Sequence, residues 1–244
     1  METQLQIDRL AMRGRPEGEP IIRQNWEDLL FLHWPIDPAE LRPLIPPHLE
    51  IDTFDGKAWI GLTPFRLTGL RVSVLPQVPG LNVFEEMNVR TYVHHHGKPG
   101  IWFFSLDASK LVPALAARLF FALPYFPANI DFSNSGGRFS FLLNRTAGPN
   151  ASFRADWRTG VRLRDPDVES LAFFLVERYC FFSVQETAVQ MTRIYHHPWI
   201  LDEAVVGSCE SHMLQGLGLT EPTDPPIAHF SKFLDVEIWP PVTV

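Results

Sequence analysis

The sequence predicts one α+β domain in which strands dominate and two main helices pack against a curled mixed sheet or barrel. Three observations support this prediction. Most segments are short apolar or alternating runs bounded by Gly, Pro and Asp, which is typical of strands. Longer helical patterns occur only over residues 107–123 and 168–179. Finally, no low-complexity linker or internal repeat divides the chain.

The first half supplies most of the signals that define individual elements. Asp37 is a carboxylate N-cap, Pro38 suits the first helical position, and Glu40 stands third, so a short helix begins there. Asp55 and Gly56 favour a tight hairpin turn, because both tolerate positive φ. The elements expected in this half are a strand over 26–34, the short helix, a hairpin over 49–65, a strand over 87–95, a turn over 96–100 and a strand over 101–106.

The second half is expected to begin with a buried helix and to continue mainly as strands. The helix over 107–123 is apolar almost all round, with Ser109 as a cap and Pro124 as its end. The remaining expected elements are strands over 138–145, 152–164, 188–196 and 232–239 and a helix over 168–179. Residues 1–24 are expected to form a loose, flexible arm that is mobile unless docked, and residues 25–244 the single folded domain.

Composition narrows the classes of partner and compartment. The net charge of −7 and the pI of about 5.7 argue against a broad electrostatic contact with nucleic acid or anionic membrane. No run of 18 apolar residues occurs, and residues 1–20 are polar and acidic, so a cytoplasmic protein is expected. Two cysteines cannot build a disulfide framework. The expected partner is a small-molecule ligand, and the question of a homo-oligomer stays open.

The strand over 87–95 carries the most informative pattern. Glu86, Asn88 and Arg90 share the same parity, so a carboxylate, an amide and a guanidinium project from one face. Burial among apolar walls would raise the pKa of the carboxyl and suit it for proton transfer, whereas a nearby arginine would lower it. The alternative, an ordinary solvent-facing strand with a weak ion pair, has equal standing.

Other polar residues stand in apolar surroundings and need partners. Arg118 lies in the middle of the expected apolar helix, so it needs a carboxylate from a ligand or from the protein, with Asp107 and Glu86 as internal candidates. Arg178 and Tyr179 pose the same question at the end of the second helix. His196 precedes a His-Pro-Trp run and is a candidate for a pocket mouth or for simple packing.

Several common chemistries lack their usual sequence evidence. Adjacent residues of the His94–His96 run would point to opposite faces of a strand, so a solvated turn is favoured and no metal site is expected. No phosphate-binding glycine loop, nucleophile elbow or Cys-x-x-Cys motif occurs, and no cofactor is expected. Cys180 is followed by two phenylalanines and is interpreted as a small buried hydrophobe.

From residue 26 to residue 239 the sequence resembles the YqjF-like bacterial proteins of unknown function, which are distantly similar to acetoacetate decarboxylase. The resemblance rests on six segments: 30–35, 53–59, 88–93, 102–108, 123–126 and 196–199. It implies the acetoacetate-decarboxylase-like fold, with a barrel around a central pocket.

The decarboxylase pattern also bears on individual residues. Phe84-Glu85-Glu86 looks like its aromatic-x-Glu motif, which places Glu86 at the pocket glutamate. Arg118 and Pro124 match a second motif, but Tyr125 and Phe126 stand where the pattern has two lysines, one of which forms a Schiff base. Neither side chain can form an imine, so the resemblance combined with this departure implies a protein that is not a Schiff-base decarboxylase.

The sequence leaves three functions open. The first is a pocket that binds a small anionic or carbonyl-bearing ligand, with Arg118 and Arg90 for charge and Tyr125 and Glu86 for hydrogen bonds; Asn88 is a further ligand-binding candidate. The second is a lysine-independent lyase, hydratase or tautomerase, with Glu86 as general base and Tyr125 as proton donor or oxyanion stabiliser. The third is a non-catalytic scaffold in which Arg118 and Glu86 neutralise each other.

Overall fold

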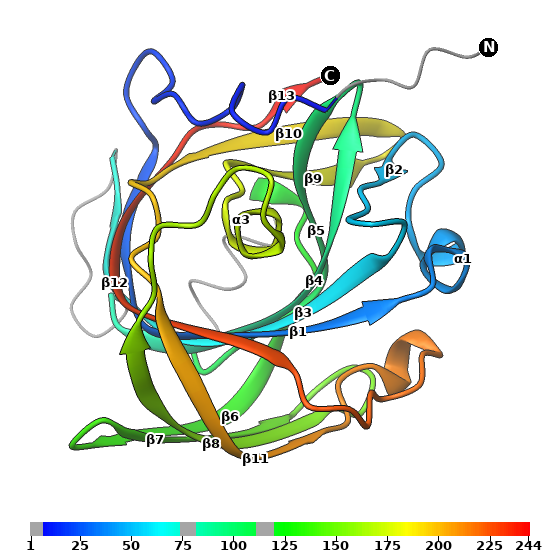
Figure 1. The fold of residues 1–244 in the computed structure, drawn as a ribbon. Helices are drawn as coiled ribbons and strands as arrows, with labels where there is room; N and C mark the ends of the chain where they lie inside the picture. The colour runs from blue at the N-terminus through cyan, green and yellow to red at the C-terminus, as the bar shows by residue number, and fades with distance from the viewer. Residues whose placement is uncertain (1–6, 74–81, 111–119) are drawn as a thin grey trace.

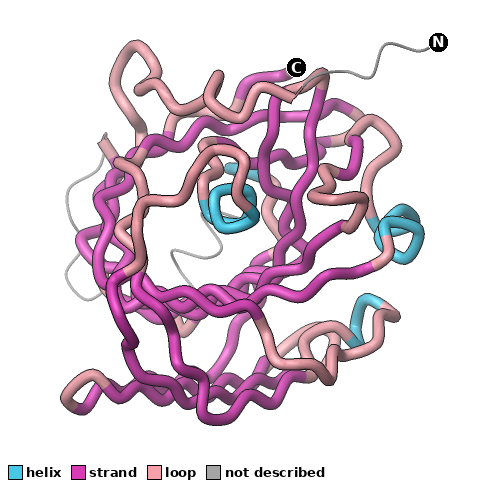
Figure 2. Tube along the Cα trace, viewed as in Figure 1, coloured by secondary structure: helices cyan, strands magenta, loops and turns pink. Residues whose placement is uncertain are grey.

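The structure is a computed structural model that describes residues 7–73, 82–110 and 120–244. Strands make up most of it (Figure 2). They are β1 (Ile22–Ile36), β2 (Glu50–Ile51), β3 (Ala58–Val72), β4 (Phe84–His95), β5 (Lys98–Ala108), β6 (Tyr125–Ser135), β7 (Arg138–Arg145), β8 (Ser152–Arg162), β9 (Cys180–Gln185), β10 (Ala188–Tyr195), β11 (Asp202–Ser211), β12 (Ile227–Ile238) and β13 (Val242–Thr243). The described helices are α1 (Pro38–Leu41), α3 (Leu171–Val176) and two 3-10 turns, η1 (Arg42–Leu44) and η2 (Gln215–Leu217).

The strands close into a barrel. Hydrogen-bonded neighbours run in the order β5, β6, β7, β8, β11, β12, β1, β3 and β4, and β4 pairs with β5 to complete the ring. A second route from β5 to β12 passes through β9 and β10. Two compartments therefore share one wall, which consists of β12, β1, β3, β4 and β5. The nine-strand ring encloses the first compartment. The second is closed by β9 and β10 and contains α3 (Figure 1).

The two faces of the shared wall carry two separate apolar cores. On β1, Leu30 and Leu32 belong to the core that includes the aromatic residues of β7 and β8, whereas Leu29 and Phe31 belong to the core around α3. Side chains of a strand alternate between its faces, so one long strand supplies both cores. The α3 core is the compartment into which the inner face of β4 points.

The predicted fold class is confirmed, and several elements match closely. The strand β7 has the bounds that the sequence predicts, and β1, β4, β5, β8, β10 and β12 contain most of the predicted ranges. The backbone N–H of Ala39 donates a 2.8 Å hydrogen bond to Asp37, which caps α1 as expected. Both Asp55 and Gly56 have positive φ, as the predicted turn requires.

Two local predictions need correction because of strand pairing, and the helix expected over 168–179 is shortened to the six residues of α3, so Arg178 and Tyr179 lie beyond its end. The expected helix over 107–123 begins too early, because β5 continues through Asp107 and Ala108 by pairing with β4; residues 111–119 lie outside the described part. The expected hairpin over 49–65 is reduced to the bridge between Phe54 and Lys57, since β2 pairs with β4 rather than with β3. In both places a long-range strand partner outweighs the local pattern.

The N-terminal segment lies against the barrel from residue 7 onward. Arg9 donates two hydrogen bonds to Asp52 at 2.7 and 2.9 Å, and Met12 is buried in a core. Arg193 donates to the carbonyl oxygens of Met12 and Gly14 at 2.7 and 2.8 Å. The regular sheet starts at Ile22, three residues before the predicted start of the domain.

Gly100 is expected to tolerate no side chain. A Cβ built there would lie 2.6 Å from Cε2 of Phe182 and 2.8 Å from Sγ of Cys180, where β5 meets β9. We expect Gly100→Ala to lower the free energy of unfolding by about 1–3 kcal/mol, the usual cost of overpacking a core. Gly14→Ala is the matched control because a Cβ there meets nothing within 4 Å. Urea denaturation checks both variants, and equal midpoints would contradict the prediction.

Candidate functional site

The inner face of β4 carries a row of buried polar side chains. Glu86, Asn88 and Arg90 are 3%, 6% and 6% exposed. They share the strand face of Phe84 and Tyr92, which belong to the α3 core. The polar face predicted from the alternation is thus turned toward the α3 compartment rather than toward solvent.

Glu86 is paired with Tyr125. Tyr125 is the first residue of β6 and pairs with Leu106 of β5. Leu106 pairs on its other side with Asn88 of β4. This order of strands brings the two side chains together, and the Tyr125 hydroxyl donates a 3.0 Å hydrogen bond to Oε2 of Glu86. The two residues named as catalytic candidates from the sequence are therefore in direct contact.

The environment of Glu86 favours its neutral form. Burial raises the pKa of the Glu86 carboxyl to about 8, the hydrogen bond from Tyr125 partly opposes this, and the negative charge of Asp107 adds to it. Burial, together with the carboxyl of Glu86, also raises the pKa of the Tyr125 phenol well above its usual value. Near neutral pH the pair is therefore uncharged, with a carboxyl proton that can be donated.

Asp107 is held by an arginine that the sequence did not single out. Arg145 of β7 contacts both carboxylate oxygens, with Nε 2.6 Å from Oδ1 and a terminal nitrogen 2.7 Å from Oδ2. The Ser105 hydroxyl donates to the same carboxylate at 3.2 Å. Asp107, one of the two partners proposed for Arg118, therefore has a bidentate partner in Arg145; Arg118 itself lies outside the described residues.

Arg90 is a buried cation without a carboxylate partner among the described residues. Its side chain donates to the carbonyl oxygen of Leu175 at 3.5 Å, and its guanidinium lies 5.2 Å from the ring centre of Phe31. Its Nε has no hydrogen-bond partner in the part of the chain that the structure describes, and neither has Oδ1 of Asn88. The polar row thus holds unused hydrogen-bonding capacity and a positive charge.

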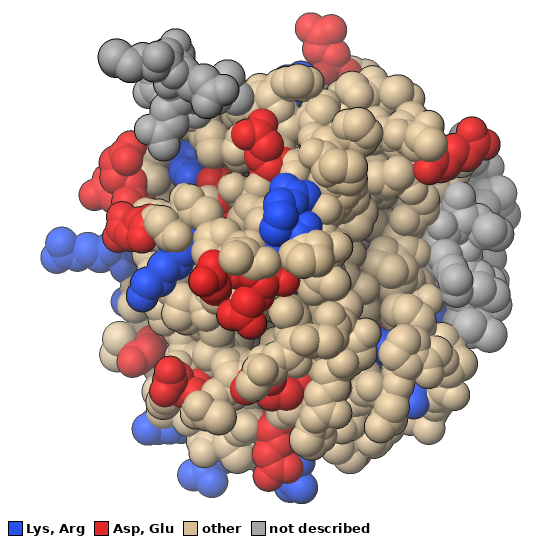
Figure 3. Space-filling view, turned by 90° about the vertical axis from the view of Figure 1, so that its right-hand side faces the viewer, with Lys and Arg blue, Asp and Glu red and all other residues tan. Residues whose placement is uncertain are grey.

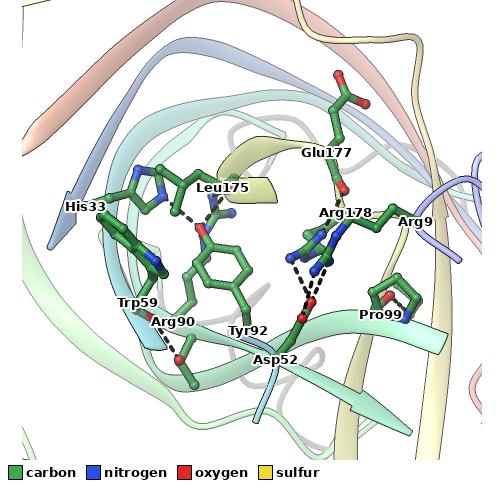
Figure 4. Close-up of polar contacts among 12 residues, drawn as sticks. Arg9, His33, Asp52, Trp59, Arg90, Tyr92, Pro99, Leu175, Glu177 and Arg178 are labelled. Carbon is green, nitrogen blue, oxygen red and sulfur yellow. Dashed lines mark hydrogen bonds and ion pairs between the residues drawn. The ribbon is translucent and has the colours of Figure 1, made fainter. Parts of the chain in front are cut away.

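Beyond Arg90, the row continues into a network that sequence reasoning missed (Figure 4). The Tyr92 hydroxyl donates to the carbonyl oxygen of Leu175 at 2.6 Å and lies 2.7 Å from Nε2 of His33. Burial, together with the positive charge of Arg90, lowers the pKa of His33 well below its usual value, so this imidazole is neutral. His33 follows Leu29 and Phe31 on β1 at two-residue spacing. This spacing is the sequence signal that could have indicated that His33 faces the same core.

Arg178 has a partner from a distant part of the chain. It donates to Oδ2 of Asp52 at 3.0 Å, and Arg9 contacts the same carboxylate from the N-terminal segment (Figure 4). Arg178 and Asp52 have side chains that are 1% and 0% exposed. Burial lowers the pKa of Arg178 to about 10, although Asp52 opposes this, so the guanidinium stays charged at neutral pH. The question that the sequence posed for Arg178 is thus answered by an internal ion pair.

Tyr179 and His196 form a separate cluster. Their rings stack with centres 4.6 Å apart, the Tyr179 hydroxyl donates to Glu177, and Glu177 also accepts from the backbone N–H of Trp199 at 3.0 Å. Burial lowers the pKa of His196. Neither residue makes a hydrogen bond to Glu86 or Tyr125 in the described structure, so the candidate ligand-binding set does not converge on one place.

The run expected to be a solvated turn lies mostly in a strand, because His94 and His95 are buried in β4 and only His96 is exposed. Nδ1 of His95 lies 2.9 Å from the carbonyl oxygen of His48, and the described residues contain no cluster of three or more metal-ligating side chains. Cys180 is fully buried, and burial raises the pKa of its thiol to about 12, which is typical of an unreactive cysteine. The four lysines are exposed: Lys57, Lys98, Lys110 and Lys232.

The described surface and helices add two simple observations. Acidic and basic side chains are interspersed with broad uncharged areas on the face shown in Figure 3. Within the described ranges, every helix is too short or too polar to cross a lipid bilayer.

Comparison with known proteins identifies the family. The model of a family of uncharacterized conserved proteins, DUF2071, matches residues 23–235. The chain belongs to this family. A relative, the uncharacterized protein YqjF of Bacillus subtilis (strain 168), is 41% identical over 225 residues, which cover 92% of this chain and 93% of that protein. The predicted YqjF-like membership is confirmed.

Solved structures at low sequence identity share the fold of this DUF2071 protein. The enduracididine biosynthesis enzyme MppR complexed with pyruvate has a TM-score of 0.65 at 14% identity, covering 93% of this chain and 91% of that one. Acetoacetate decarboxylase from Legionella pneumophila has a TM-score of 0.62 at 16% identity, covering 97% and 94%. An acetoacetate decarboxylase-like enzyme from Sphingomonas wittichii RW1 has a TM-score of 0.63 at 14% identity, covering 93% and 94%. The acetoacetate-decarboxylase-like fold is therefore confirmed.

Proposed function

We propose that this protein binds a small anionic or carbonyl-bearing molecule in the α3 compartment, at the Glu86–Tyr125 pair, without forming an imine. One observation carries the proposal: a buried carboxyl accepts a 3.0 Å hydrogen bond from a tyrosine hydroxyl at the edge of the α3 core. Convergent polar groups among apolar walls, one of them with a perturbed pKa, are a common feature of ligand sites.

The chemistry of the pair suits a carbonyl group. With a pKa of about 8, Glu86 carries a proton at neutral pH. Tyr125 donates to Oε2, so the carboxyl proton is free to sit on Oε1 and to point toward a ligand oxygen. A neutral donor of this kind binds a carbonyl oxygen and stabilises negative charge that develops on it.

Arg90 and Asn88 support an anionic ligand. They follow Glu86 along the same face of β4, and each has a buried polar atom without a partner in the described structure. A buried guanidinium without a carboxylate favours a bound anion, because the ligand would offset the cost of burying the charge. One structural neighbour, the enzyme MppR, is complexed with pyruvate, an oxo acid that carries both a carboxylate and a carbonyl.

The surroundings argue against covalent chemistry through an amine. All four lysines are exposed, and Tyr125 stands where the decarboxylase pattern leads us to expect a lysine. We therefore expect no mass adduct when the protein is incubated with an oxo acid and sodium borohydride. An adduct on Lys110, the lysine closest in sequence to this region, would overturn that part of the proposal.

The second candidate is a lyase, hydratase or tautomerase that uses Glu86 and Tyr125 without lysine. The observation that favours it is the pKa of Glu86, since proton transfer is most efficient when the pKa lies near the working pH. The raised pKa changes the expected roles: near pH 7 Glu86 is mainly a proton donor, and it becomes a base as the pH passes about 8. The Tyr125 phenol keeps its proton and serves as a hydrogen-bond donor.

Calorimetric titration with pyruvate, acetoacetate and the uncharged ketone acetone tests the proposal. We expect saturable binding of at least one oxo acid at pH 7, weaker binding of acetone, and at least tenfold weaker binding by Tyr125→Phe. Tyr195→Phe is the matched control, because no hydrogen bond to its hydroxyl exists in the described structure. If none of the three compounds binds, the non-catalytic scaffold is favoured and the proposal fails.

Proton exchange separates binding from catalysis. If the protein is catalytic, deuterium exchange at carbons next to the ligand carbonyl is expected in the wild-type protein and lost in Glu86→Gln. The affinity of that variant for the ligand should stay within about tenfold, or roughly 1.4 kcal/mol. Equal loss of affinity and exchange would show that Glu86 only binds, which supports the first candidate against the second.

A further inference from the structure

A slot opens in the barrel wall where β5 changes its neighbour. On this side β5 pairs with β9 only at Ile101 and Trp102, and with β6 only from Leu106 onward. On this side, opposite to β4, the described residues therefore provide no strand partner for residues 103–105. Strands that splay apart in this way leave backbone polar groups and side chains accessible between them.

Aromatic side chains line the slot. Its volume is about 290 Å³, and Trp102, Phe103, Phe104 and Phe182 form much of its surface. The three residues of β5 are partly exposed there. No charged side chain belongs to its described lining, which sets it apart from the polar row on β4. Its chemistry favours an uncharged, flat and mostly apolar occupant.

One polar side chain in the slot lacks a partner. Ser183 of β9 lines the slot and is 3% exposed, and its Oγ has no hydrogen-bond partner among the described residues. Buried hydroxyl groups are nearly always hydrogen-bonded, so an unpartnered one requires an explanation. A ligand with one hydroxyl or carbonyl group would satisfy it and would be fixed in orientation.

We propose that this slot is a second binding site, specific for an uncharged aromatic molecule of about two fused rings whose single hydroxyl or carbonyl group hydrogen-bonds to Ser183. Size supports the choice, because an apolar cavity of about 150 Å³ holds benzene, and this slot has about twice that volume. Glu86, Arg90 and Tyr125 do not belong to its described lining, so its contacts differ from those of the proposed oxo-acid site, although Pro124 of the lining directly precedes Tyr125.

A pair of probes that differ by one hydroxyl tests the inference. We expect 2-naphthol to bind the wild-type protein about three- to tenfold more tightly than naphthalene, measured by saturation-transfer and chemical-shift NMR. Ser183→Ala should remove this difference, because it removes the hydroxyl and keeps the apolar walls. The variant is expected to fold, since the hydroxyl has no described partner to lose.

Filling the slot supplies the second arm of the test. Val184→Trp, on the slot wall, should abolish binding of both probes, whereas Val161→Trp, at a residue that is 68% exposed, should leave both affinities unchanged. Glu86→Gln should also leave them unchanged, so failure here is distinguishable from failure at the oxo-acid site. Equal affinity of the two probes for the wild-type protein, or binding that persists in Val184→Trp, would overturn the proposal.

Discussion

The wild-type protein is expected to lose about 5 kcal/mol of unfolding free energy, relative to Glu86→Gln, as the pH rises from 4.5 to about 9. Burial raises the pKa of Glu86 from 4.5 to about 8. The folded state therefore prefers the protonated carboxyl, and its stabilising effect is fully present below pH 4.5 and lost as the pH rises through about 8. The pKa of Glu86 is about 3.5 higher in the folded state than in the unfolded state. Because one pKa unit corresponds to 1.36 kcal/mol, the total is about 5 kcal/mol.

Urea unfolding of both proteins at a series of pH values measures this effect. Gln keeps the size of the side chain and an oxygen that accepts from Tyr125, and it does not titrate. Other groups cancel in the difference between the two proteins. Glu169→Gln, at an exposed glutamate, is the matched control and should follow the wild-type profile. Parallel profiles for the wild type and Glu86→Gln would contradict a buried carboxyl with a raised pKa.

The core of the candidate site was accessible from sequence because it depends on local alternation. The parity of Glu86, Asn88 and Arg90 follows directly from the two-residue period of a strand, and the apolar partners Phe84 and Tyr92 on that face indicate an interior position. The family pattern then directed attention to Tyr125. Its contact with Glu86 needs two strand pairings, which the sequence alone does not supply.

The long-range partners could not be predicted for the same reason. Asp52 and Arg178 are 126 residues apart, and Asp107 and Arg145 are 38 residues apart, so no local spacing links them. Three long strands were also missed, together with the two-residue β13. Pro127 and several polar residues obscure β6, β9 follows directly on the predicted helix over 168–179, and β11 contains Gly207 and acidic residues. In each strand, pairing with neighbours outweighs a weak intrinsic preference.

Removing Arg145 is expected to destabilise the protein by about 3–5 kcal/mol, because Asp107 would remain as a buried charge without its bidentate partner. The two side chains are 5% and 0% exposed, so water cannot replace the lost contacts. Urea unfolding of Arg145→Gln at pH 7 measures the cost. Arg162→Gln is the matched control: its side chain is 61% exposed, and it pairs with Asp202 near the surface, so a loss of less than about 1 kcal/mol is expected.

The same change should act on Glu86 at a distance. Asp107 raises the pKa of Glu86, and Arg145 neutralises Asp107, so Arg145→Gln should move the titration of Glu86 further above pH 8. Adding Asp107→Asn removes the negative charge, so the double variant should regain part of the lost stability and return the titration to a lower pH. Carbonyl-carbon NMR of the glutamate side chains follows that titration directly. If the double variant is as unstable as Arg145→Gln alone, lost packing rather than the unpaired charge causes the destabilisation, and the electrostatic link from β7 to Glu86 is wrong.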